Sequence, residues 1–257
     1  MSRRGATLLE TVASLGLFSL LSLLLFAAFR SGTELWRSVD QRATGLGKLH
    51  PVQRALALDI LSSSAENLDS ARLPTPGNGD AVWMLSALDR NETDPRAERF
   101  KRDSSGSPEW QRNVIYYLVR PSDHDDLVGY SCNVDPDPEG DAFCPHKLLI
   151  RKIVNHPASP ERLLTSAEVQ AYLTSPTGFD MTSFSGESGL EEAKVLAANL
   201  LWFEAVEHSL DNRFIELDLR VASLQEATRG AAVGREPLTR FTFGQRVTLF
   251  PGIEGPP

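Results

Sequence analysis

The residue types that most often carry out catalysis are present in this chain, but they do not form a recognised catalytic pattern. The five histidines are scattered, and no two have the four-residue spacing with which a helix holds zinc. The chain also lacks the glycine-rich motifs of nucleotide-binding loops and the G-x-S-x-G motif of serine hydrolases. The densest titratable group, residues 123–126 (DHDD), consists of consecutive residues whose side chains point in different directions, which favours a solvated loop. The sequence therefore predicts no catalytic residue, no metal ligand and no cofactor.

Residues 135–141 (DPDPEGD) match the first half of a calcium-binding loop but not its closing ligand. The bidentate glutamate of an EF-hand would fall at His146, and two prolines stiffen the backbone between the acidic residues. We interpret this stretch as an acidic, solvated loop. Calcium held in an irregular site is the alternative.

One apolar run lies close to the amino terminus, with no charged residue between Thr11 and Phe29. As a helix rising about 1.5 Å per residue, it would cover roughly the 30 Å hydrocarbon core of a bilayer. The basic residues Arg3 and Arg4 precede it, so the positive-inside rule places residues 1–5 in the cytoplasm and the chain after Arg30 across the membrane. A cleaved signal peptide is the alternative, but this run is longer than a signal core and no A-x-A-like site follows it.

Residues 5–12 (GATLLETV), together with the basic leader and the uncharged run, resemble the type IV prepilin signature. The resemblance implies that a prepilin peptidase cuts after Gly5 and that Ala6 becomes the methylated amino terminus. It also implies that Glu10 is a membrane-embedded carboxylate used when subunits stack through their apolar helices. Ala6 departs from the family, which usually has phenylalanine there.

Glu10 has a physical reason to lie in this otherwise apolar helix. An amino terminus freed at Ala6 would be a cation at the membrane edge, and Glu10 of a neighbouring chain could neutralise it and set the stagger between subunits. The alternative is that Glu10 lies near the headgroups and snorkels towards them.

The only two cysteines, Cys132 and Cys144, fall in the part of the chain predicted to lie outside the cytoplasm. A disulfide between them is expected there, and closing a loop of about 13 residues would stabilise the fold by roughly 3 kcal/mol. A redox-active pair is disfavoured because the spacing is not C-x-x-C.

The remaining pattern predicts an α+β fold in which a long amino-terminal transmembrane and assembly helix precedes an antiparallel sheet domain. The helix is expected to run to about residue 44, to break near 45–51 at Gly45, Gly47 and Pro51, and to resume to about residue 66. Thr165 and Glu168 have the spacing of a capping box, which predicts a short helix within 162–173. Alternating apolar residues predict strands at 81–88, 114–120, 127–131, 147–154, 200–206, 213–222 and 239–250.

These elements divide the chain into a leader, a span, helical segments, a sheet domain and a tail. The corresponding ranges are 1–5, 6–30, 31–68, 69–250 and 251–257. The net charge of −8 disfavours nucleic acid as a partner, and the 41% hydrophobic content argues against a disordered or multi-span protein.

After the prepilin-like helix, the chain has a second helix with residues 54–59 (RALALD) and strands with residues 114–118 (VIYYL) and 147–151 (KLLIR), followed by residues 196–200 (LAANL) and then Phe203 and Glu204. This order of elements is similar to that of the J-type minor pseudopilins of type II secretion, and W-type minor pilins share much of it. The resemblance implies a non-catalytic subunit of the inner membrane, with its carboxyl-terminal domain in the periplasm, that helps to initiate or cap a pseudopilus. Its partners would be other pilins or pseudopilins, the prepilin peptidase and the inner-membrane assembly platform. A minor type IV pilin acting in adhesion, motility or DNA uptake is one alternative. A membrane-anchored hydrolase or binding protein is another.

Overall fold

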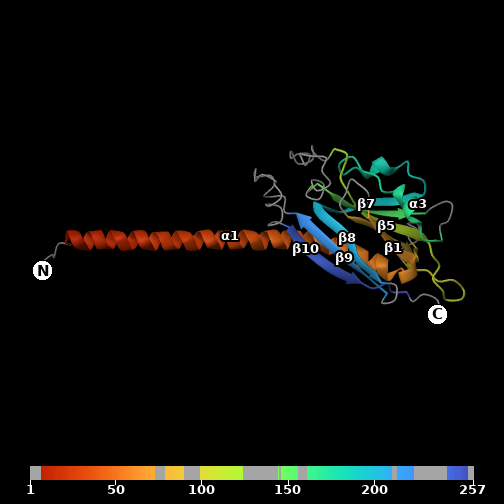
Figure 1. Cartoon of the computed structure of the whole chain (residues 1–257), viewed down its shortest axis with the longest axis horizontal. Coiled ribbons are helices and arrows are strands. Elements are labelled where there is room, and N and C mark those ends of the chain that lie inside the picture. Colours follow the sequence, from red (N-terminus) through yellow and green to blue (C-terminus); the bar gives the residue numbers. More distant parts are fainter. Residues whose placement is uncertain are drawn as a thin grey trace. The chain divides into compact units, whose positions relative to one another are not determined.

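The computed structural model describes residues 7–72, 79–89, 99–123, 144, 146–155, 161–209, 213–222 and 242–253. One long helix is followed by antiparallel sheets, which is the α+β layout that the sequence predicts (Figure 1). The chain divides into two compact units, residues 1–44 and residues 45–257. The long helix contributes to both units.

Helix α1 runs without interruption from Leu8 to Leu61, so the predicted break at residues 45–51 is wrong. Pro51 lies inside the helix, where proline costs about 3 kcal/mol because it lacks an N–H and crowds the carbonyl four residues earlier. That earlier residue is Gly47, which has open space around it. Several apolar side chains near the proline are fully buried, and each contributes about 1.5–3 kcal/mol, so packing outweighs the cost of the proline. These side chains are Leu49, Val52, Leu56 and Ile60.

The larger sheet has five antiparallel strands in the order β1-β2-β5-β6-β7. Its strands are β1 (Leu68–Arg72), β2 (Asp80–Ser86), β5 (Arg112–Val119), β6 (Leu148–Val154) and β7 (Leu190–Ala198). A smaller sheet has the order β10-β9-β8, with β8 (Leu200–Ser209), β9 (Phe214–Ala222) and β10 (Thr242–Leu249). The strands β3 (Leu88–Asp89) and β4 (Arg99–Phe100) form a separate ribbon.

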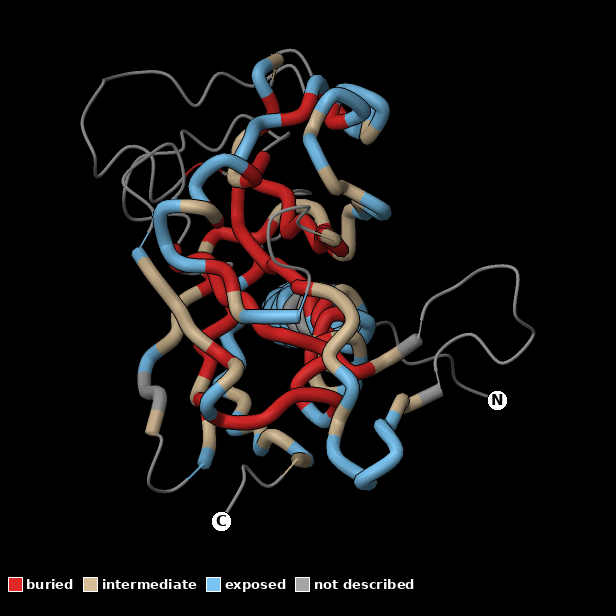
Figure 2. The backbone as a smooth tube through the Cα atoms, turned by 90° about the vertical axis from the view of Figure 1, so that its right-hand side faces the viewer, coloured by how far each residue is buried: buried red, intermediate tan, exposed pale blue. Residues whose placement is uncertain are grey.

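Both faces of the five-stranded sheet are covered. One face shares a core with the buried residues of α1 and with β8 and β9 of the smaller sheet. The other face packs against α3 (Ser166–Gln170) and the short 3-10 helix η2 (Met181–Phe184). Residues of β2 and β6 are buried along the whole strand. Figure 2 shows that the buried segments gather in the middle of the strand-rich unit. Both sides of these strands are therefore covered, and most of their side chains are apolar.

The two sheets meet where β2 begins. A Cβ added to Gly79 would lie 2.4 Å from the carbonyl oxygen of Phe203 in β8, so only glycine permits this approach of the two backbones. The carboxylate of the neighbouring Asp80 accepts a hydrogen bond from the backbone N–H of Ala205 at 2.9 Å. Burial raises the pKa of Asp80, although this hydrogen bond opposes the rise.

Most of the predicted strands are confirmed, with shifted ends, and the short helix is confirmed with its capping box. Thr165 accepts from the backbone N–H of Glu168 at 3.4 Å, and Glu168 accepts from that of Thr165 at 2.8 Å. The predicted strand at 127–131 lies outside the described residues. The predicted ranges do not include the strands β1, β4 and β7. β7 lacks regular alternation because its pairing with β6 shifts register twice, between Leu149 and Ile150 and between Ile153 and Val154.

The first residues of the predicted tail are ordered against the end of α1. Ile253 donates a backbone hydrogen bond to the carbonyl of Ser63 at 3.2 Å and forms a parallel bridge with Ser64. Residues 251–253 of the predicted tail are therefore held against the chain that follows α1. Residues 254–257 lie outside the described part of the chain.

Candidate functional site

The first turn of α1 contains Glu10 in a reciprocal pair of hydrogen bonds with Thr7. The backbone N–H of Thr7 donates to Glu10 Oε2 at 2.9 Å, and the backbone N–H of Glu10 donates to Thr7 Oγ1 at 3.3 Å. This is a capping box, and its T-x-x-E pattern could have been found in the sequence. Glu10 therefore has a local role at the start of the helix. The predicted processing residues Gly5 and Ala6 lie outside the described residues.

The segment Leu8–Arg37 is long and apolar enough to cross a membrane. All residues from Leu8 to Gly32 are exposed within this chain. The large apolar side chains between Leu8 and Phe29 are each 56% to 86% exposed. An apolar surface of this extent is unfavourable in water, which suits a segment that lies in lipid or against other apolar surfaces.

The predicted disulfide falls partly outside the described residues, which include Cys144 but not Cys132. Cys144 is buried. The acidic stretch 135–141 and residues 124–126 also lie outside the described ranges. Among the residues that the structure describes, no three His, Cys, Asp or Glu side chains gather closely enough to hold a metal ion.

A buried ionic network joins α1 to the middle of the five-stranded sheet. Arg151 of β6 donates from Nε to Asp59 Oδ2 at 2.6 Å and from Nη2 to Asp59 Oδ1 at 3.1 Å. Tyr116 of β5 donates its hydroxyl to Asp59 and accepts from Arg151 Nε at 3.2 Å. Burial alone would lower the pKa of Arg151, but its hydrogen bonds and attraction to Asp59 raise it. Burial and the nearby Asp59 charge raise the pKa of Tyr116 well above its usual value.

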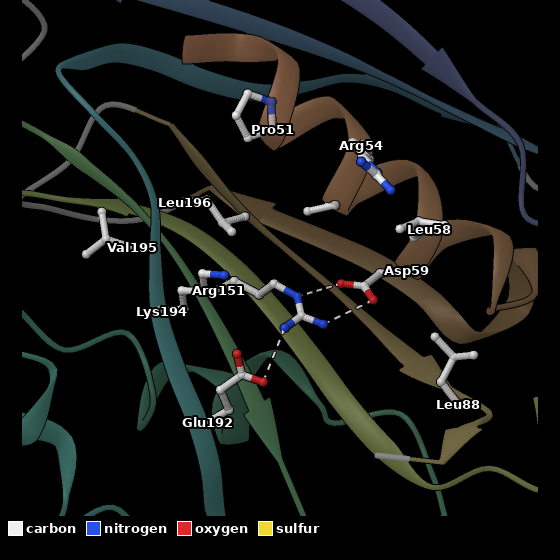
Figure 3. A pocket seen from close by; sticks show the side chains of 11 residues that line it. Pro51, Arg54, Leu58, Asp59, Leu88, Arg151, Glu192, Lys194, Val195 and Leu196 are labelled. Atoms are coloured by element: carbon white, nitrogen blue, oxygen red, sulfur yellow. Dashed lines mark hydrogen bonds and ion pairs between the residues drawn. The ribbon is translucent and has the colours of Figure 1, made fainter. Parts of the chain in front are cut away.

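A pocket of about 500 Å³ lies beside this network (Figure 3). One wall is formed by α1, with Arg54 and Leu58, and the facing wall by β7, with Lys194 and Leu196. Arg151 lies between the walls, and its Nη1 is 3.7 Å from Glu192 Oε2. The pocket therefore combines charged groups with apolar walls.

A second buried cation, Lys152, lies on the opposite face of the same sheet. Its Nζ donates to both carboxylate oxygens of Glu187 at 2.7 Å and to the carbonyl of Tyr172 at 2.7 Å. Nζ also lies 3.8 Å from the ring centroid of Phe184 and 5.4 Å from that of Tyr117. Burial lowers the pKa of Lys152 to about 8, although Glu187 opposes the change. Since the side chain of Lys152 is fully buried, this group holds the α3 side of the domain together and offers no access to a substrate.

The sequence contains a signal for both networks, which is the presence of ionisable residues within apolar stretches. Asp59 stands in the apolar stripe of α1 between Leu56 and Ile60, and Arg151 and Lys152 interrupt an otherwise apolar strand. Ionisable residues at buried positions are usually paired. Their partners could not be identified because they are distant in the sequence.

Comparisons with family models, with curated proteins and with solved structures each found no match to this chain.

Proposed function

We propose that the protein is a non-catalytic minor pseudopilin of the J type, which helps to initiate or cap the pseudopilus of a type II secretion system. In this proposal the amino-terminal helix is anchored in the inner membrane and residues 45–257 lie in the periplasm. The observation that carries the proposal is the apolar surface of α1, which is exposed around the whole helix from Leu8 to Phe29. Such a surface suits a subunit that exchanges lipid for neighbouring helices when it assembles.

The position of Glu10 supports the same function. Its carboxylate is the only side-chain charge in the described residues from Thr7 to Phe29. The capping hydrogen bond uses Oε2, so Oε1 remains available to the amino terminus of a neighbouring subunit. Small residues cluster near the start of the helix, where they permit close approach of another helix. They are Ala13, Ser14, Gly16 and Ser19.

Two alternative functions are compatible with the same features. A minor type IV pilin would use the helix in the same way, and the genes beside this one would distinguish it from a secretion subunit. A membrane-anchored hydrolase or binding protein would use the helix only as an anchor, and the pocket beside Arg151 favours this binding role. The experiments must therefore separate assembly from anchoring.

Amino-terminal sequencing of the membrane form tests processing. Co-expression with a prepilin peptidase should give a chain beginning at Ala6, and omission of the peptidase should leave Met1 or Ser2 at the start. A chain cut after residue 30 and released from the membrane would contradict the proposal.

Cysteine cross-linking in cells tests assembly. Partner contacts are expected chiefly within residues 6–44, so Ser14→Cys or Ser22→Cys should capture other pilin-like subunits. Ser104→Cys, at an exposed turn of the sheet domain, is the matched control and should capture fewer. Capture by Ser104→Cys alone would mean that the helix is only an anchor.

A further inference from the structure

The pocket beside Arg151 has an excess of positive charge in a chain whose net charge is −8. Its lining includes the cations Arg54, Arg151 and Lys194 and the carboxylates Asp59 and Glu192, which leaves one net positive charge. Asp59 is already bound by both Arg151 and Tyr116. An anionic group is therefore the ligand that this pocket would favour.

Arg151 is positioned to bind such a group. Its side chain is 8% exposed, and two of its three nitrogens are held by Asp59. The third nitrogen, Nη1, is directed towards the pocket and forms an ion pair with Glu192 Oε2 at 3.7 Å, a distance longer than a hydrogen bond (Figure 3). A guanidinium fixed in this way loses little freedom when it binds a carboxylate.

Two exposed cations stand on opposite walls of the pocket. Lys194 pairs with Arg151 across the two strands, so its side chain lies on the same face of the sheet as Arg151. Arg54 projects from α1 on the other side. Within the described part of the chain, neither Arg54 nor Lys194 makes an ion pair or a hydrogen bond. Both side chains are therefore available to bind a ligand.

The pocket opens beside a sheet edge, which suggests what kind of ligand carries the anion. β7 is the last strand in the order β1-β2-β5-β6-β7, so its outer side has no neighbouring strand among the described residues. Lys194, Val195 and Leu196 of this strand line the pocket, and Leu58 and Leu88 add apolar surface. An extended peptide could pair with the edge and place alternate side chains in the pocket.

We infer that the pocket between α1 and β7 is a docking site for an extended segment of a partner protein that carries an aspartate or glutamate. The carboxylate lies between Arg54 and Lys194 and reaches Arg151 Nη1, and an apolar residue of the segment contacts Leu58 and Leu196. A small free anion would satisfy the cations but would leave the apolar walls and the edge of β7 unused. This inference goes beyond the proposed function and does not depend on the apolar segment Leu8–Arg37 of α1.

Site-specific photo-cross-linking in the full-length membrane protein tests the site. A benzoylphenylalanine replacing Leu58, which is 55% exposed and lines the pocket, should form an adduct with one partner protein. Mass spectrometry of the adduct should place the cross-link within a few residues of an acidic side chain in an extended segment. The matched control is the same probe at Phe179, which is 58% exposed and lies outside the pocket lining.

Charge reversal then decides whether the cations recognise the partner. Arg54→Glu combined with Lys194→Glu should lower the yield at Leu58 by at least about tenfold and leave the yield at Phe179 unchanged. Both residues are exposed, so the fold should persist, and an unchanged denaturation midpoint of the full chain would verify this. Replacing the partner's acidic residue by lysine should restore the yield.

Three outcomes would overturn the inference. They are the absence of a protein adduct at Leu58, an adduct whose yield is unchanged by the charge reversal, and a cross-link to a part of the partner that has no acidic residue nearby. An adduct with lipid alone would overturn it as well. Cross-linking through Ser22→Cys distinguishes this failure from failure of the proposed function. That cross-link depends on the membrane helix and should persist when Arg54 and Lys194 are reversed.

Discussion

Asp59 and Arg151 are 92 residues apart in the sequence and form a two-pronged ion pair under the last turns of α1. The side chains are 3% and 8% exposed, so water screens their attraction little. The pair fixes where the helix lies on the sheet, because the guanidinium of Arg151 must match the two carboxylate oxygens of Asp59 at once.

Breaking this pair on one side should be strongly destabilising. Asp59→Ala leaves Arg151 buried without its carboxylate and is expected to cost about 3–5 kcal/mol of unfolding free energy. The double change Asp59→Leu with Arg151→Met removes both charges and should recover most of that loss. Chemical denaturation of the full chain in detergent, followed by tryptophan fluorescence, measures both values. A loss below about 1 kcal/mol for Asp59→Ala would show that the pair contributes little to the fold.

The stability of the sheet domain should rise with pH in a window set by Lys152. Burial lowers the pKa of Lys152 in the folded chain to about 8, whereas the ordinary value is 10.5. Between these values the unfolded chain binds more protons at this lysine than the folded chain does, so stability increases as the pH rises. Above about pH 10 the stability should instead fall as the pH rises. Burial raises the pKa of Tyr116 and Tyr117 in the folded chain, so these tyrosines lose their protons at a lower pH in the unfolded chain.

Denaturation at several pH values between 8 and 9.5 measures this slope. Lys152→Met combined with Glu187→Gln removes the charged pair without leaving Glu187 unpaired. It should reduce the slope and leave the smaller part that comes from Lys48, whose pKa burial also lowers. An equal slope in the two proteins would mean that Lys152 keeps its ordinary pKa when folded.

The attachment of residues 251–253 to the end of α1 depends on Gly252. A Cβ at this position would lie 2.4 Å from the carbonyl oxygen of Leu61, which is backbone and cannot move aside cheaply. Gly252→Ala should therefore release the segment and break the hydrogen bond from Ile253 to Ser63. Limited proteolysis should then cut the chain after β10 several-fold faster. Gly186→Ala, where a Cβ meets nothing within 4 Å, is the control and should leave the rate unchanged.

The sequence predicted the elements that rest on local patterns and missed those that rest on distant contacts. The capping box of Thr165 and Glu168 and the alternation in β9 are readable from neighbouring residues, and both are confirmed. The continuity of α1 through Pro51 depends on burial of Leu49 and Val52 in a core built mostly from later strands, which no local rule contains. The pocket requires α1, β6 and β7 to meet, so its lining could not be deduced from spacing.

The two roles of Glu10 can be separated because glutamine preserves one of them. Glutamine can accept the hydrogen bond from the backbone N–H of Thr7 that Glu10 now accepts at 2.9 Å, since a capping box tolerates either residue. It carries no charge, however, and so cannot neutralise the amino terminus of a neighbouring subunit. Glu10→Gln should therefore insert and be processed normally but lose cross-linking through Ser22→Cys as fully as Glu10→Ala does.

The complementary change is Thr7→Ala, which removes the hydroxyl that accepts the backbone N–H of Glu10 at 3.3 Å and keeps the carboxylate. It should weaken the first turn by about 0.5–2 kcal/mol and leave cross-linking close to the wild-type yield. The measurement is the yield of Ser22→Cys adducts in the three variants, with amino-terminal sequencing of each membrane fraction to confirm processing. If Glu10→Gln assembles like the wild type while Glu10→Ala and Thr7→Ala do not, Glu10 serves the helix start and the subunits are registered by other contacts.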